Sequence, residues 1–107
     1  MSSLKDILSN TSNELLSESK DEVLKLLSQA LSSNNEFVKK NVEKIERWTV
    51  MLSEGEIDKE EFDGLVSAQR RKVDQYLNTV EINLRSEAEK ITHGLIKIVV
   101  NQVVPIL

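Results

Sequence analysis

Cysteine is absent from this sequence, and glycine and proline are rare. The absence of cysteine excludes disulfide bonds, zinc ribbons and thiol catalysis. Folds built from strands and tight turns need far more than the three glycines and one proline found in these 107 residues. We therefore expect an all-α fold in a single domain, with long helices and few interruptions.

Long apolar runs and a surplus of basic residues are also missing. No stretch of about 18 apolar residues is present, so a conventional membrane-spanning helix is not expected. The first residues lack the basic start and apolar run of a secretory signal, which makes a cytoplasmic protein the default expectation. The net charge of −4 disfavours broad binding to nucleic acid, and the basic residues at 70–72 point in different directions around a helix.

Residues that could perform catalysis or hold a metal are scarce. His93 is the only histidine, and without cysteine a zinc site would need three or more carboxylates. A di-iron bundle needs Glu-x-x-His pairs, but Lys90 stands three residues before His93, and Glu89 is placed only to pair with it. The acidic run at 54–63 departs from the order of an EF-hand and suits helix capping instead. We expect no catalytic site, no cofactor and no metal, and hence a protein that is not an enzyme.

Apolar residues recur at a spacing of eleven along both halves of the chain. The two main rows are Leu4, Leu15, Leu26, Phe37 and Trp48, and Phe62, Val73, Leu84, Leu95 and Ile106. Eleven residues over three turns is about 3.67 residues per turn, so this hendecad-like pattern predicts nearly straight helix packing instead of a heptad coiled coil. Helices are expected over about 3–31, 36–53 and 58–103, with a tight reversal at 53–58. A helix of roughly 45 residues is about 68 Å long.

The reversal between the two halves is the clearest local signal. Gly55 can adopt the left-handed conformation that ends a helix. Asp58 is placed to cap the next helix, with Glu61 completing a capping box, and Ile57 and Phe62 are spaced as a hydrophobic staple. The expected fold is a long antiparallel helical hairpin, or a three-helix bundle if the first helix folds back.

The polar stretch at 32–35 allows two interpretations. Ser33 and Glu36 have the spacing of a capping box, which would start a new helix after a break. The apolar rows pass this stretch in register, so a continuous helix is the alternative.

Residues 52–65 also follow the pattern L-x-x-G-x-I-x-x-E-E-F-x-x-L. The matching residues are Leu52, Gly55, Ile57, Glu60, Glu61, Phe62 and Leu65. This segment resembles the motif of the short C-terminal domain (SHOCT) family, although here it lies in the middle of the chain. The resemblance implies helical pairing and oligomer formation, and no catalysis.

The segment from Ile91 to the last residue is rich in isoleucine, leucine and valine, and Lys97 carries its only fixed charge. Such a surface aggregates when it is exposed, so something must cover it. Its many β-branched residues leave open whether 96–104 is a helix or a strand. We expect burial inside this protein or its own oligomer, with a partner protein or a membrane surface as the alternatives. The candidate interface residues are Leu95, Ile98, Val99, Val103 and Ile106.

These patterns favour a structural, non-enzymatic helical protein that self-associates and binds a protein partner through helix packing. The hypothesis depends on the excess of apolar surface over what a thin hairpin can bury. The alternative is a peripheral membrane or lipid-binding protein. Interfacial helices usually carry many lysines and arginines, whereas this chain is acidic.

Overall fold

Four α-helices dominate the computed structural model, which describes residues 17–106 and, within them, the side chains of 21–101 and 103–105. The helices are α2 (Ser17–Leu31), α3 (Glu36–Ser53), α4 (Lys59–Leu77) and α5 (Ile82–Ile98). The last helix continues into a π-helical turn (Val99–Val103) and a 3-10 turn (Val104–Ile106). No strand occurs between residues 17 and 106. The all-α class predicted from the sequence is confirmed, and the segment 96–104 is helical.

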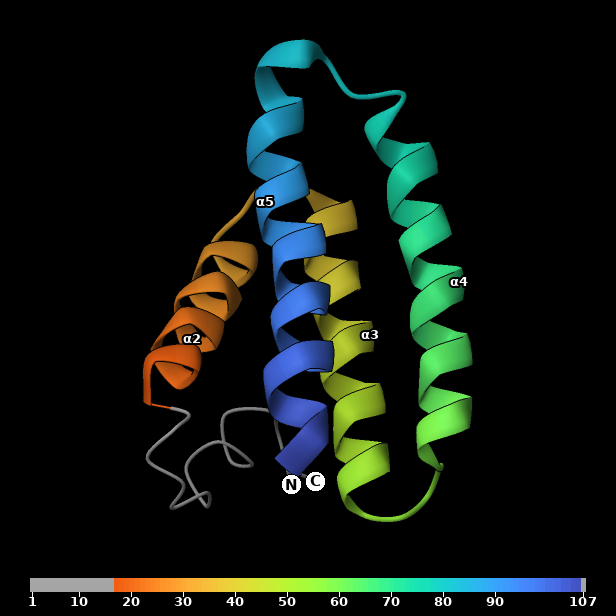
Figure 1. Ribbon diagram of the computed structural model, residues 1–107. Coiled ribbons are helices and arrows are strands. Elements are labelled where there is room, and N and C mark those ends of the chain that lie inside the picture. The colour runs from red at the N-terminus through yellow and green to blue at the C-terminus, as the bar shows by residue number, and fades with distance from the viewer. Residues whose placement is uncertain (1–16, 107) are drawn as a thin grey trace.

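The helices pack around a central pair. α3 and α5 contact each other, α2 packs against both of them on one side, and α4 packs against both on the other (Figure 1). The longest dimension is 40 Å, and the other two are 26 and 24 Å. The predicted thin hairpin, whose last helix alone would measure about 68 Å, is therefore corrected to four shorter helices that enclose a core.

The predicted helix over 58–103 is broken at 78–81. Two groups satisfy carbonyls at the end of α4: the Thr79 hydroxyl donates to the Tyr76 carbonyl at 2.7 Å, and Arg85 Nε donates to the Leu77 carbonyl at 2.8 Å. The buried row of apolar residues spaced by eleven is interrupted after this break, because Leu84 is 57% exposed. α5 thereby turns back along α4 and reaches α2 and α3 as well.

The chain also breaks between α2 and α3, as the first of the two interpretations of this stretch proposed. The capping residue is Asn35 and not Ser33. The Asn35 side-chain oxygen accepts hydrogen bonds from the backbone N–H groups of Phe37 at 2.9 Å and Val38 at 3.2 Å. Ser33 supports the cap indirectly, since its hydroxyl oxygen accepts from the Asn35 N–H at 3.0 Å.

The reversal between α3 and α4 has the local geometry that its sequence predicts. Gly55 has φ +78°, and paired hydrogen bonds from the Gly55 and Glu56 N–H groups return to carbonyls in the last turn of α3. Asp58 Oδ1 accepts from the Glu61 N–H at 2.7 Å, and the Glu61 carboxylate accepts from the Asp58 N–H at 3.3 Å, which completes a capping box. Phe62 is fully buried, and Ile57 is partly buried against the same core.

Alanine substitutions at two glycines of this hairpin are expected to change its stability in opposite directions. An added Cβ meets no atom within 4 Å at either Gly55 or Gly64, so only the backbone conformation decides the effect. Gly55→Ala is expected to lower the free energy of unfolding by about 1–2 kcal/mol, because alanine is strained at positive φ. Gly64→Ala, inside α4, is expected to raise it by about 0.5–1 kcal/mol. Urea denaturation of both variants checks this, and equal signs would contradict the assigned turn.

Candidate interaction surfaces

The C-terminal apolar segment, for which burial inside the chain or its oligomer is predicted, lies in the core of a single chain. Leu95 and Val99 are 0% exposed and Val103 is 1% exposed, while Ile98 is partly buried against them. The Ile106 side chain falls outside the described residues. The reason for this burial is the break at 78–81, which brings this segment against α2 and α3. No second chain is needed to cover these three buried residues.

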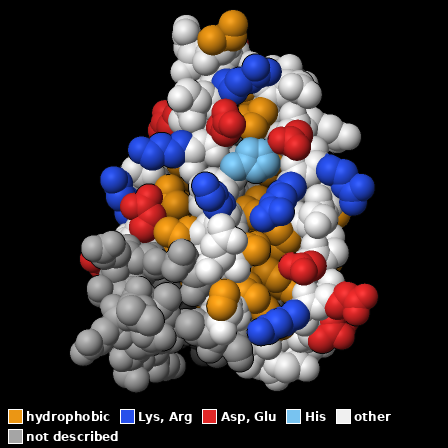
Figure 2. Space-filling view, viewed as in Figure 1, with side chains coloured by type: hydrophobic (Ala, Val, Ile, Leu, Met, Phe, Trp, Pro, Cys, Tyr) orange, Lys and Arg blue, Asp and Glu red, His pale blue; other side chains and the backbone are white. Residues whose placement is uncertain are grey.

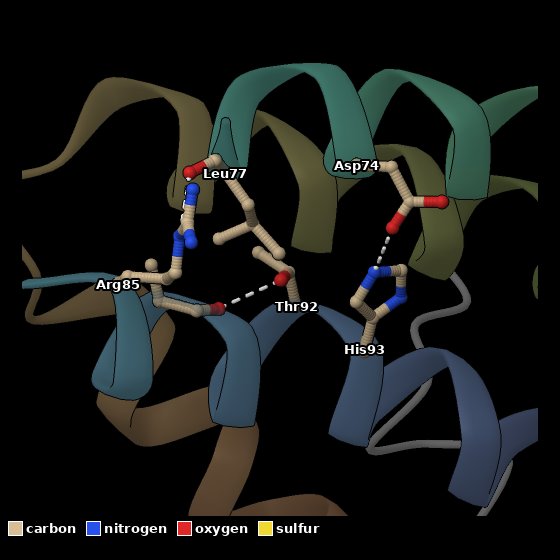
Figure 3. Close-up of polar contacts among 6 residues, drawn as sticks. Asp74, Leu77, Arg85, Thr92 and His93 are labelled. Carbon is tan, nitrogen blue, oxygen red and sulfur yellow. Dashed lines mark hydrogen bonds and ion pairs between the residues drawn. The ribbon is translucent and has the colours of Figure 1, made fainter. Parts of the chain in front are cut away.

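Polar contacts across the α4–α5 junction involve the only histidine (Figure 3). His93 Nε2 lies 2.9 Å from Asp74 Oδ1, with the two side chains 28% and 67% exposed. Its partner is thus Asp74 of α4, and not Glu89 of its own helix. The nearby Thr92 hydroxyl donates to the Ala88 carbonyl at 2.7 Å, a bond within α5. This exposed pair holds two helices together, and within the described residues no group of three or more histidine or acidic side chains could hold a metal ion.

A pair of amide side chains is buried where α3 meets α4. Gln69 Nε2 donates to Asn41 Oδ1 at 2.9 Å, and the two residues are 2% and 1% exposed. The remaining amide atoms, Asn41 Nδ2 and Gln69 Oε1, have no hydrogen-bond partner in the described part of the chain. The spacing of the apolar residues does not predict that these two polar side chains are buried between α3 and α4.

We expect the single and double replacements of this pair to behave differently. Gln69→Met leaves the buried Asn41 amide without a partner, which costs about 1–3 kcal/mol. Replacing both residues, Asn41→Leu together with Gln69→Met, removes the unpaired groups and is expected to be neutral or stabilising. Chemical denaturation of the single and double variants measures the coupling. A double variant less stable than either single variant would contradict this account.

The start of α5 presents large apolar side chains to solvent. Ile82 is 84% exposed and Leu84 is 57% exposed, and Leu31 at the end of α2 is 62% exposed. Leu84 also lines a hollow of about 470 Å³ between the α2–α3 connection and α5, together with Val38 and Ile91. The first turn of α5 extends beyond the end of α2 in Figure 1. These side chains form a small apolar end of the bundle, which we call the α5 tip (Ile82 and Leu84).

A basic cluster spans α3 and α4. Lys40, Lys44 and Arg47 lie on one side of α3 through their spacing of four and three residues, and Lys72 of α4 lies close enough to Lys44 for direct interaction. Partial burial, followed by the positive charges of Lys72, Arg47 and Lys40, lowers the pKa of Lys44 below its ordinary value. Among the described residues no lysine or arginine forms an ion pair with an acid, so none of these four basic groups has an acidic partner there.

Charge is distributed differently on the side where α5 and α4 lie in front. Figure 2 shows acidic and basic side chains interspersed there, with apolar atoms visible between the two helices. In the sequence, Lys72 belongs to the basic run 70–72, whose residues point in different directions around a helix. Its neighbour Lys44 comes from another helix, so only the packing of α3 on α4 brings the cluster together.

Comparison of the chain with protein-family models, with curated proteins and with solved structures finds no match. The resemblance of residues 52–65 to the SHOCT motif therefore stays a prediction.

Proposed function

We propose that this protein is a non-enzymatic helical interaction protein that self-associates and binds a protein partner through helix packing. The observation that carries the proposal is the exposure of large apolar side chains at the α5 tip, 84% for Ile82 and 57% for Leu84. Single exposed apolar residues are ordinary, but Leu84 lies beside a hollow that Val38 and Ile91 also line, which offers a place for an apolar side chain of a partner helix.

The polar groups described above support the same proposal. The contacts of His93, Thr92 and Arg85 all hold helices in place, and none of them brings a nucleophile next to a base. Within residues 17–106, no helix is long and apolar enough to cross a membrane. A ligand or partner would therefore bind to the surface of the helical bundle.

Sedimentation velocity from low to high micromolar concentration tests the self-association. The chain has a mass of 12.2 kDa, and we expect a rise in sedimentation coefficient toward a dimer or a larger oligomer. A monodisperse 12.2 kDa monomer over the whole range would contradict self-association.

Co-sedimentation with vesicles separates this proposal from lipid binding. Vesicles of neutral and of anionic phospholipid are each mixed with the protein, and we expect it to stay in the supernatant with both. Pelleting that is lost in an Ile82→Ser, Leu84→Ser variant but kept in an Asn83→Ser control would instead assign the α5 tip to a membrane surface.

A further inference from the structure

One side of the α3–α4 hairpin differs from the rest of the surface in its residue pattern. On α3 it carries Phe37, Lys40, Lys44, Trp48 and Met51, and on α4 it carries Glu61, Leu65, Ala68, Lys72 and Tyr76. Spacings of three, four and seven residues place each set on one side of its helix. We call this surface the α3–α4 face.

Contacts between the two helices show that both sets belong to the same side of the hairpin. The rings of Phe37 and Tyr76 stack with centroids 4.1 Å apart and planes 6° apart. Lys44 and Lys72 adjoin each other, and the buried Asn41–Gln69 bond lies beneath them. None of the aromatic residues of the face is fully buried.

The α3–α4 face is polarised along its length. Lys40, Lys44 and Lys72 stand toward one end. The turn at the other end carries five exposed acids against the single base Lys59. The acids are Glu54, Glu56, Asp58, Glu60 and Glu61.

Partly buried apolar side chains occupy the middle of the face. Trp48 lies between Lys44 and the turn on α3, and Leu65 lies between the turn and Lys72 on α4. The basic and acidic ends are therefore about 17–18 Å apart, at 1.5 Å per residue over eleven or twelve residues. An apolar centre with a charged periphery is the usual composition of a specific interface.

Such a surface is complementary to a copy of itself. When two α3–α4 faces meet antiparallel about a two-fold axis near Trp48, the basic end of each lies opposite the acidic turn of the other. A parallel arrangement would instead bring like charges together, which is costly. α3 is about 27 Å long and two helices are about 20 Å wide, so the face covers roughly 540 Å² in projection. The two partners together contribute about 1,080 Å², which is the size of a weak or transient interface.

We propose that a second copy of this chain docks on the α3–α4 face, forming a two-fold antiparallel dimer in which Lys44 and Lys72 of each protomer face the acidic turn of the other. This inference rests on the proposed self-association and names its surface. The attraction at both ends is between exposed charges, so the dimer weakens as ionic strength rises.

Two charge-reversal variants test the arrangement. Lys44→Glu with Lys72→Glu makes the basic end acidic, and Glu54→Lys, Glu56→Lys and Glu60→Lys together make the turn basic, with four bases against the two remaining acids Asp58 and Glu61. Each variant alone would set like charges against each other at both ends of the dimer, so its dimer dissociation constant is expected to rise roughly a hundredfold. Mixed in equal amounts, the two variants are expected to form a heterodimer close to wild-type affinity, because opposite charges then meet at both ends.

A third variant controls for net charge. Lys25→Glu with Lys90→Glu lowers the net charge by the same amount as Lys44→Glu with Lys72→Glu, but at exposed positions of α2 and α5. It is expected to dimerise like the wild type and to form no heterodimer preferentially with the turn variant. Circular dichroism verifies that all three keep their helical content, and sedimentation velocity at low and high salt gives the dissociation constants.

The possible results distinguish a dimer through the α3–α4 face from self-association in general. Loss of dimer in both test variants, with recovery in their mixture, supports the α3–α4 face. A dimer that survives both reversals but dissociates in Ile82→Ser, Leu84→Ser overturns this inference and leaves the proposed function standing on the α5 tip. Equal weakening by the α2 and α5 control also overturns it, because net charge would then explain the effect. A wild-type protein that stays monomeric defeats the proposed self-association itself.

Discussion

A chain that ends at Thr92 is expected to lose its cooperative fold. The deletion removes Leu95, Ile96, Val99 and Val103, each at most 1% exposed. Burying one such side chain contributes about 1.5–3 kcal/mol, so the four together contribute roughly 6–12 kcal/mol. A domain of this size is stable by only about 5–15 kcal/mol in total. Circular dichroism and denaturant titration should show low helical content and no sigmoidal transition.

The exposed Lys97 provides the control within the same segment. Lys97→Ala is expected to change the free energy of unfolding by less than about 0.5 kcal/mol, because the side chain lies at the surface. A truncated chain that kept a cooperative transition and changed only its oligomeric mass would contradict this prediction. The C-terminal segment would then be an interface between copies.

Phe62→Ala is expected to lower the free energy of unfolding by about 3–5 kcal/mol. Phe62 is 0% exposed and belongs to the first turns of α4, where the capping box at Asp58 fixes the direction of the helix. Removing the ring leaves a cavity beneath the reversal, because the ends of α3 and α4 are tied by the turn and cannot close the space fully. The shift of the urea midpoint at unchanged slope measures the loss.

Alanine substitutions at Ile57 and Lys59 provide two comparisons for Phe62→Ala. Ile57→Ala should cost less than Phe62→Ala because Ile57 is only partly buried, and still more than Lys59→Ala, which changes an exposed position. Lys59→Ala is expected to stay within about 0.5 kcal/mol. If it proves as damaging as Phe62→Ala, the hairpin is not anchored where the capping box and the buried ring place it.

Local signals in the sequence determined the α3–α4 reversal and the class of fold. Gly55, Asp58 and Glu61 act through hydrogen bonds to residues within five positions of themselves, so their effect does not depend on the rest of the chain. The scarcity of glycine and proline likewise acts locally, since each long stretch without them favours helix. These features could be read because neighbours in sequence are also neighbours in space.

The break at 78–81 was not predicted, because its local signals are weak. Asn78 and Thr79 disfavour helix only slightly, and the apolar spacing of eleven continues through them to Leu84 and Leu95. One long helix and two shorter ones satisfy that spacing equally well. The difference between them is the burial of Leu95 and the residues after it against α2 and α3, a gain that depends on residues far away in the chain.

The same distinction applies to the candidate surfaces. The sequence by itself determined that the chain is helical, poor in residues suited to catalysis, and reversed at Gly55. Only the tertiary structure decided that the C-terminal segment is core, that Ile82 and Leu84 are exposed, and that Lys44 meets Lys72. Hydrogen bonds in a turn reach a few residues, whereas burial and charge clustering depend on which helix faces are brought together, and that depends on the whole fold.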